Sequence, residues 1–189
     1  MKKLGLKMKK LIILLALTFS HQAYSKWFAD IHLGFGFVPD TDDNDNEIIF
    51  EGLETGIRFG LGHKILIFGF DGSYGWMNSD FPYLSTTDVP MKKYDLGVFV
   101  GLEFHKLFRV WASYFPKSEW NFDTTGSPKL EGTAMGGGFG LTVLPYVTFN
   151  GEIKFYNMNT LTVSENSTTW TNDEKIKPYE LIFSLGFIF

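Results

Sequence analysis

The segment that decides the fold is YELIFSLGFIF, residues 179 to 189, the last eleven residues of the chain. Every second residue, counted back from the end, is large and apolar: Phe189, Phe187, Leu185, Phe183, Leu181 and Tyr179. The other face carries Glu180, Ser184 and Gly186. A period of two predicts a β-strand with one apolar face and one small or polar face. Eleven residues in a tilted strand are also about the number needed to cross the hydrocarbon core of a bilayer.

Seven further segments show the same alternation, with glycine, serine and charged residues opposite the large apolar ones. They cover residues 27–37, 52–61, 66–76, 94–104, a segment that starts at Phe108, 133–143 and 147–157. Phe99 is an exception, because it falls on the small and polar face. Pro116 interrupts the fifth segment, so this strand either bulges there and continues to Trp120 or ends early. The pattern predicts eight strands.

The volume of the side chains indicates which face points outward. The interior of an eight-stranded barrel is just wide enough for side chains to fill it, and dozens of large rings could not fit inside. We therefore expect the bulky face to point into lipid, in an all-β, transmembrane, eight-stranded antiparallel up-and-down β-barrel over residues 26–189. The alternative is a lipocalin-like soluble barrel, which would stay monomeric in buffer without detergent. Aromatic side chains at the strand ends favour the membrane barrel over the soluble one, because such residues gather at the two membrane interfaces. Four lie outward at one end of the strands, Tyr74, Trp76, Tyr94 and Tyr179, and Trp27 lies at the other end.

Residues 1–25 have the features of a secretory signal peptide. Five lysines precede a short apolar run over residues 11–17, and Ala23-Tyr24-Ser25 offers small residues at alternate positions for cleavage. The apolar run is too short for a membrane-spanning helix. We expect the mature chain to begin at residue 26.

The mature chain is acidic and lacks cysteine. Five of the 17 basic residues and none of the 21 acidic residues lie in 1–25, which leaves 12 against 21, a net charge of about −9 with histidine neutral. This balance argues against nucleic acid as a partner, because phosphate contacts require a basic patch. The absence of cysteine excludes disulfide bonds. Nothing in the composition predicts a cofactor.

The connections between the expected strands alternate between short and long. Three connections are tight turns, at residues 62–65, 105–107 and 144–146. The other four are long and polar, at residues 38–51, 77–93, 116–132 and 158–178. Both termini then lie on the side of the short turns. Outer-membrane barrels have short periplasmic turns and longer extracellular loops, so we expect periplasmic termini and four extracellular loops that bind an unidentified ligand.

On these residues the chain resembles the small bacterial outer-membrane barrels of the OmpA/OmpX type, without a periplasmic domain. The last strand resembles the C-terminal strand of that family, which the barrel-assembly machinery recognises. The resemblance implies that this strand is an assembly signal, carried by Tyr179, Leu181, Phe183, Leu185, Phe187 and Phe189. It also implies a monomer in the outer membrane, in contact with lipid and lipopolysaccharide. Its function would be structural or adhesin-like, with a narrow cation-selective channel or a lipid A-modifying enzyme as alternatives.

The sequence does not favour catalysis or a metal centre. Lipid A enzymes of this fold work near the extracellular end, whereas His63 and His105 fall in expected periplasmic turns and His32 faces the lumen. The acidic segment 40–51 matches part of a calcium loop, but Asp45 occupies the position where that loop needs glycine. We interpret this segment as a solvated acidic loop.

Charged residues on the inward faces predict a polar plug. Seven inward carboxylates face three inward cations, so water, bound cations or protonated carboxyl groups must balance an excess of four. We expect Glu103 to oppose Arg109, and Asp71 to oppose Gly56 and lie diagonal to Arg58. The expected lumen network comprises Glu54, Arg58, Asp71, Glu103, Arg109, Glu152 and Lys154.

A row of glycines in the sixth strand predicts its register with the seventh. If the two strands pair around the turn at 144–146, Val143 opposes Val147. In this register a glycine lies opposite a large polar residue at three inward pairs, which are Gly140 with Asn150, Gly138 with Glu152 and Gly136 with Lys154. We expect these glycines to make room for the polar side chains of the neighbouring strand.

Overall fold

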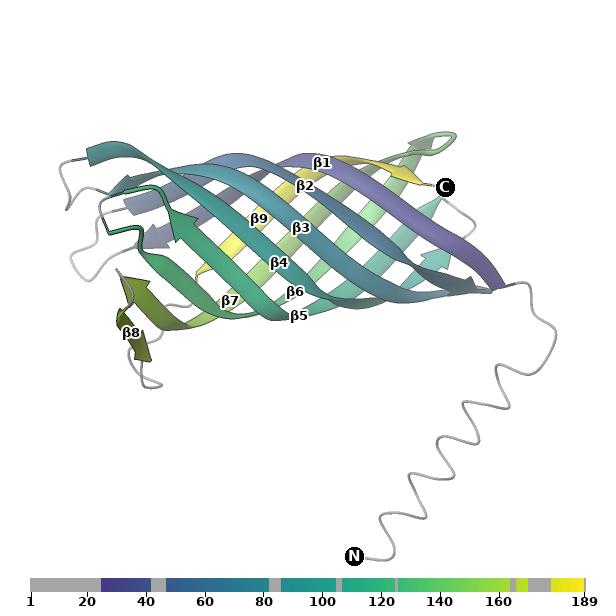
Figure 1. Cartoon of the computed structure of the whole chain (residues 1–189). Helices are drawn as coiled ribbons and strands as arrows, with labels where there is room; N and C mark the ends of the chain where they lie inside the picture. The colour runs from purple at the N-terminus through teal and green to yellow at the C-terminus, as the bar shows by residue number, and fades with distance from the viewer. Residues whose placement is uncertain are drawn as a thin grey trace, which may run out of the picture.

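The computed structural model describes residues 25–41, 47–81, 86–104, 107–124, 126–163, 166–169 and 178–188, and it is a closed antiparallel barrel (Figure 1). Eight strands form its wall: β1 (Ser25–Thr41), β2 (Glu47–His63), β3 (Leu66–Phe81), β4 (Thr86–Phe104), β5 (Phe108–Phe122), β6 (Lys129–Leu144), β7 (Val147–Val163) and β9 (Tyr179–Ile188). Strands β1 to β7 pair in chain order, and β9 closes the barrel between β7 and β1. The short strand β8 (Asn166–Thr169) pairs with the end of β7. The predicted all-β, eight-stranded up-and-down architecture is confirmed.

The first residue of β1 and the last residue of β9 lie at the same end of the barrel (Figure 1). We call this end the turn side and the opposite end the loop side. Residues 1–24, most of the expected signal peptide, lie outside the described residues, and Ser25, assigned to that peptide, begins β1. In the part of the chain that the structure describes, no helix is long and apolar enough to span a bilayer.

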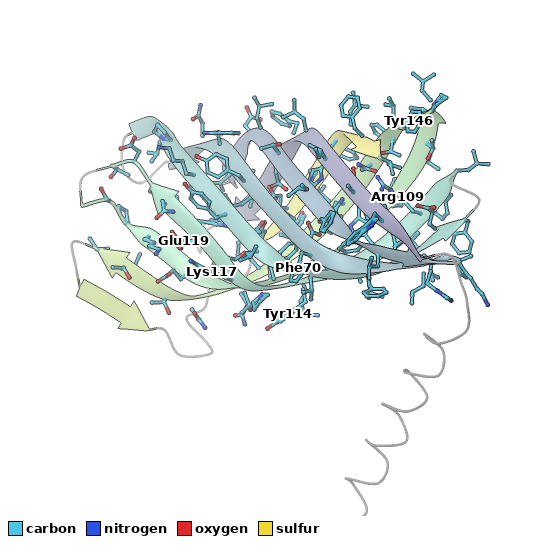
Figure 2. All side chains as sticks on the ribbon, turned by 45° about the vertical axis from the view of Figure 1, so that its right-hand side comes forward. Phe70, Arg109, Tyr114, Lys117, Glu119 and Tyr146 are labelled. Atoms are coloured by element: carbon cyan, nitrogen blue, oxygen red, sulfur yellow. The ribbon has the colours of Figure 1, made fainter. Side chains whose placement is uncertain are left out.

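The outer wall is apolar over the middle and turn-side part of the barrel, as the alternation predicts. Phe70 and Tyr114 point away from the barrel with 67% and 48% of their surface exposed (Figure 2). Such large exposed fractions recur on every wall strand, which is typical of a surface that faces lipid.

Strands β1 to β7 are longer than the alternation predicts. They contain 15 to 19 residues, against about 9 to 11 needed to cross a membrane, whereas β9 contains 10. Much of the four predicted loops is therefore strand, and those predicted boundaries are wrong. β5 does not end at Pro116: the register shifts between Phe115 and Ser118, and the strand continues to Phe122. Because proline cannot donate a ladder hydrogen bond, a bulge is the position where a strand tolerates it.

At the loop side the polarity of the wall is reversed. The volume of the side chains predicted an apolar outer face and a polar inner face along the whole strand. At this end the outward residues are polar, as in Lys92, Glu119 and Asn121, and the interior is apolar. We name this interior group the loop-side cap: Val38, Phe50, Met77, Val89, Met91, Phe115, Trp120, Phe122, Leu130, Ala134, Tyr156 and Met158. This end of the barrel has the polarity of a soluble protein, so it extends beyond the bilayer.

One predicted hairpin register is wrong by two residues. Asp71 was expected opposite Gly56, but Leu61 pairs with Phe68, because the turn contains only Lys64 and Ile65 between His63 and Leu66. Lys64 adopts a positive φ of 56°, which allows this tight turn. As a result Asp71 lies directly opposite Arg58.

The register of β6 and β7 is largely as predicted. The three glycine pairs, Gly140–Asn150, Gly138–Glu152 and Gly136–Lys154, are confirmed. The pair at the turn is wrong, because the register shifts between Thr142 and Leu144 and Leu144 then opposes Val147.

Candidate functional site

The lumen contains two layers of paired charges. In the layer nearer the loop side, the Lys93 ammonium binds Glu54 and Glu180 and lies 3.9 Å from Asp95. The Lys154 Nζ lies 2.8 Å from Glu54 and 2.9 Å from Asp95. These five side chains are at least 97% buried and come from β2, β4, β7 and β9, so they tie together strands from around the barrel.

Hydroxyl groups complete this layer. The Tyr156 hydroxyl lies 2.6 Å from Glu180 and 3.0 Å from Asp95. Ser118 donates to Asp95, and Lys154 donates to the Ser73 hydroxyl at 2.8 Å. Buried charges are tolerated when they are paired and hydrogen-bonded. We call this group the Lys93 layer.

The second layer lies nearer the turn side and is centred on two arginines. Arg58 donates to Asp71 at 3.0 Å and also binds Glu152, while its Nη1 lies 3.5 Å from Asp30. Arg109 Nη2 lies 2.8 Å from Asp30 and donates to Thr148 and Asn150 at 2.9 and 3.0 Å. Both guanidinium groups also contact the Trp111 ring, at 4.3 and 5.5 Å from its centroid. We call this group the arginine layer.

Apolar groups bound the two charged layers. The loop-side cap lies beyond the Lys93 layer, where the Trp120 and Tyr156 rings meet edge to face at 5.0 Å. At the turn side, Phe28, Ile67, Phe99 and Trp111 form a second buried cluster. Phe99, the exception in the alternation, packs here against Phe28 with ring centroids 5.6 Å apart. The lumen is therefore filled in the order apolar, charged, apolar.

Six of the seven predicted network residues make ion pairs within these layers: Glu54, Arg58, Asp71, Arg109, Glu152 and Lys154. The seventh, Glu103, is buried and opposes Arg109 in register, as predicted. The ion pair of Arg109 with Asp30 was not predicted. Asp30 is one of the seven inward carboxylates, but its partner depends on contacts across the lumen that local register does not reveal.

Lys93 is the functional residue that sequence reasoning missed. It was assigned to a loop, whereas it lies fully buried inside the barrel. The signal was present, since Lys93 lies two residues before Asp95 and shares its inward face on β4. With Lys93 the inward count becomes seven carboxylates against four cations, which leaves an excess of three.

The three carboxylates of the Lys93 layer could in principle hold a metal ion. One oxygen from each of Glu54, Asp95 and Glu180 lies within 4.8 Å of the others. However, the ammonium groups of Lys93 and Lys154 are bound among them, where a cation would lie. The geometry therefore favours a site of paired charges over a metal centre.

The inward glycines make room for larger side chains, but not always for those that were predicted. A Cβ atom on Gly140 would meet Asn150 and Arg109. A Cβ atom on Gly138 would overlap the Trp111 ring of β5, whereas the prediction named Glu152 of β7. Trp111 is the direct partner of Gly138 in the β5–β6 register, whereas the prediction considered only the register of β6 with β7.

The outward row of β9 matches the predicted orientation. Tyr179, Phe183, Leu185 and Phe187 are exposed on the outer wall, and Leu181 is half-buried there. Phe189 lies outside the described residues. The role of this row as an assembly signal stays a prediction.

Solved structures provide the likeness to known proteins. Ail, the attachment invasion locus protein of Yersinia pestis, is 13% identical over 87% of this chain and 99% of its own, with a TM-score of 0.56. A structure of Ail in complex with the heparin analogue sucrose octasulfate gives 12% identity over the same shares and a TM-score of 0.58. Neisserial surface protein A is 11% identical, over 87% of this chain and 99% of its own, with a TM-score of 0.51. No protein-family model and no curated protein sequence matches this chain. At these identities the likeness concerns the fold alone.

Proposed function

We propose that this chain, which has the fold of the small eight-stranded bacterial outer-membrane barrels, is a monomeric outer-membrane protein with a sealed lumen that acts through its loop-side end. The apolar outer wall supports insertion into a bilayer. In the usual orientation of such barrels, the turn side with both termini faces the periplasm and the loop side faces the medium.

The filled lumen is the observation that carries this proposal. Two layers of buried ion pairs lie between two apolar clusters, so an ion would have to displace paired charges and then cross apolar side chains. Both steps are costly, because buried charges without partners are strongly disfavoured. This filling argues against the narrow cation-selective channel and leaves surface interaction or envelope structure as the role.

We further propose that the barrel is not an enzyme. His32 is buried in the lumen with 2% of its surface exposed, and His63 lies at the turn side. Neither position gives a histidine access to lipid or solute at the outer leaflet. An adhesin-like role is supported by the loop-side strand extensions, which continue the wall beyond its apolar part. The sucrose octasulfate complex shows that one protein of this fold, Ail, binds a sulfated sugar analogue.

Planar-bilayer recording of the purified mature barrel tests the sealed lumen. We expect no steady conductance for the wild type. Trp120→Ala opens the loop-side cap and Arg109→Ala removes a cation from the arginine layer, so a double variant should conduct if this filling seals the lumen. Lys129→Gln, at a half-buried outer-wall position, serves as the control and should stay silent. Steady cation-selective conductance in the wild type would overturn the proposal in favour of the channel.

A further inference from the structure

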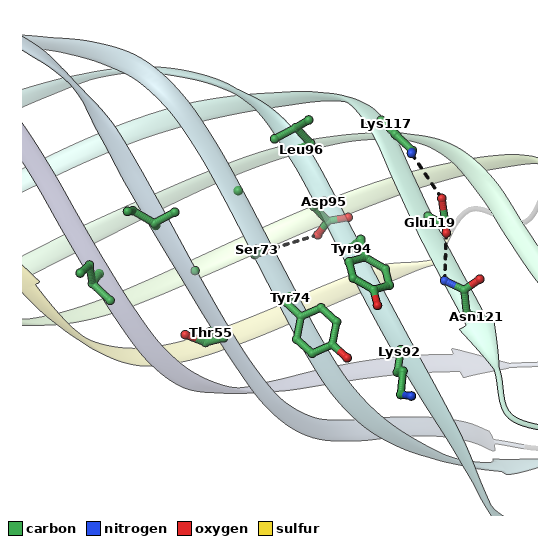
Figure 3. Close-up of a pocket in the computed structure, with 14 residues that line it drawn as sticks. Thr55, Ser73, Tyr74, Lys92, Tyr94, Asp95, Leu96, Lys117, Glu119 and Asn121 are labelled. Atoms are coloured by element: carbon green, nitrogen blue, oxygen red, sulfur yellow. Dashed lines mark hydrogen bonds and ion pairs between the residues drawn. The ribbon is translucent and has the colours of Figure 1, made fainter.

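A groove crosses the outer wall over strands β1 to β5, with a volume of about 1000 Å³ (Figure 3). It follows a line of paired outward residues that runs across the strands: Ile31, Ile57, Gly72, Leu96 and Lys117. The neighbouring line contributes Thr55, Tyr74 and Tyr94. The groove therefore begins among aliphatic side chains and ends among polar ones.

The groove is hollow because Gly72 faces outward without a side chain. A Cβ atom at this position would have no neighbouring heavy atom closer than 3.8 Å, so the space above it is open. Gly151, another outward glycine, is different, because the Phe139 ring covers it. Thr55 adds a second short side chain beside the gap.

The dimensions of the groove match one leaflet of a membrane. Five strands about 4.8 Å apart span roughly 19 Å along the groove. Barrel strands tilt by about 35–45°, so a line across them also runs obliquely through the bilayer. Its vertical extent is then close to half of the roughly 30 Å hydrocarbon core. An acyl chain could follow the groove from the midplane to the interface.

Two exposed lysines, Lys92 and Lys117, flank the polar end of the groove, one on either side of the Tyr74–Tyr94 pair in the view of Figure 3. Lys92 makes no ion pair with any other residue that the structure describes. Lys117 has a side chain that is 65% exposed and lies 3.5 Å from Glu119, which is closer to Lys129 at 3.1 Å. An exposed pair of this kind contributes little, so Lys117 can exchange Glu119 for another anion.

We propose that this groove binds lipid A, with one acyl chain along Gly72 and a phosphate group between Lys92 and Lys117. The inference rests on the proposed function, which places the loop side at the outer leaflet. A lipid tail that leaves the groove enters another apolar environment, so the groove alone cannot supply much selectivity. The two lysines must therefore provide most of the preference, by binding a phosphorylated head group.

Native mass spectrometry of the mature barrel, released from detergent micelles that contain a titrated lipid, tests the proposal. The probes are lipid A, dephosphorylated lipid A and phosphatidylglycerol. We expect the wild type to retain one lipid A in preference to the other two. The double variant Lys92→Gln/Lys117→Gln should bind lipid A about 25-fold more weakly, at about fivefold for each lysine. Gly72→Leu, which fills the open space, should weaken it at least about threefold through lost contacts.

Two matched variants serve as controls. Lys64→Gln removes an exposed lysine of the turn between β2 and β3 that does not line the groove, and Gly137→Leu fills an outward glycine elsewhere on the wall. Both should bind lipid A as the wild type does. Equal retention of phosphatidylglycerol and lipid A, or equal losses in the control and groove variants, would overturn the inference. A sealed barrel that inserts into bilayers without preferring lipid A refutes this inference alone. A barrel that conducts, or that does not insert, refutes the proposed function.

Discussion

At the scale of single residues, Lys93 has the largest consequence for stability. Its ammonium group is fully buried and binds Glu54 and Glu180. Lys93→Met keeps the volume but leaves these carboxylates short of a partner, and we expect it to lower the free energy of unfolding by about 3–5 kcal/mol. Urea unfolding in lipid vesicles measures this change. Lys129→Met breaks more exposed pairs and should cost about 0–1 kcal/mol. Equal losses in the two variants would show that the Lys93 layer does not stabilise the barrel.

The two neighbouring glycines of β6 make a second residue-scale prediction. Gly138 faces the lumen under the Trp111 ring, whereas a Cβ atom on Gly137 would have no contact closer than 3.5 Å. Gly138→Leu should therefore lower the stability by about 1–3 kcal/mol or prevent folding, because it overpacks a confined site. Gly137→Leu and Met135→Leu, both on the outer wall, should fold in detergent with the yield of the wild type. Similar yields for all three variants would contradict the packing around Trp111.

At the scale of the strand, the bulge in β5 separates two environments. Before it, Tyr114 is an exposed aromatic residue on the outer wall, and after it Glu119 and Asn121 occupy that wall. A strand that simply crossed the membrane would not need these additional residues. The inverted polarity beyond the bulge indicates that the strand leaves the hydrocarbon core at this point.

Charge tolerance along neighbouring strands tests this boundary. Val98 is exposed on the outer wall of β4, near the middle of its apolar stretch. Val98→Arg should cost about 2–4 kcal/mol, whereas Asn121→Arg, beyond the bulge, should cost about 0–1 kcal/mol. Unfolding in lipid vesicles gives both values. A large cost at Asn121 would place the membrane boundary closer to the end of the barrel.

At the scale of the whole molecule, closure depends on residues far apart in the chain. β1 pairs with β9 from Asp30–Ile188 to Phe37–Leu181, so the wall cannot close before the last strand is made. Such non-local pairing is slow to form, because it follows the entropic cost of closing a very long loop. A signal on the last strand would allow the assembly machinery to act when all strands are present.

The predicted assembly signal can be separated from stability. We expect Phe189→Ser to reduce the amount of folded barrel in the outer membrane of expressing cells. The same variant, refolded in detergent, should keep the unfolding midpoint of the wild type, because the pairing of β9 with β1 that the structure describes, from Leu181 to Ile188, does not include this residue. The heat-modifiable shift on gels measures folding in both settings. An equal loss in cells and in detergent would assign Phe189 a role in packing instead of recognition.

The sequence by itself determined the number of wall strands, their alternation and the side of the wall that faces lipid. A period of two places alternate side chains on opposite faces of a strand, and this local rule holds for β9 as it does for β4. It also predicted most of the lumen network, since inward positions can be counted along each strand.

Only the tertiary structure decided the partners inside the lumen. The contacts of Lys93 with Glu180 and of Arg109 with Asp30 cross the barrel between strands that are not neighbours, so no local period encodes them. The loop-side cap escaped prediction for a related reason. Alternation has the same period whether the apolar face points outward or inward, and the switch occurs where the barrel leaves the membrane, which depends on the closed shape of the wall.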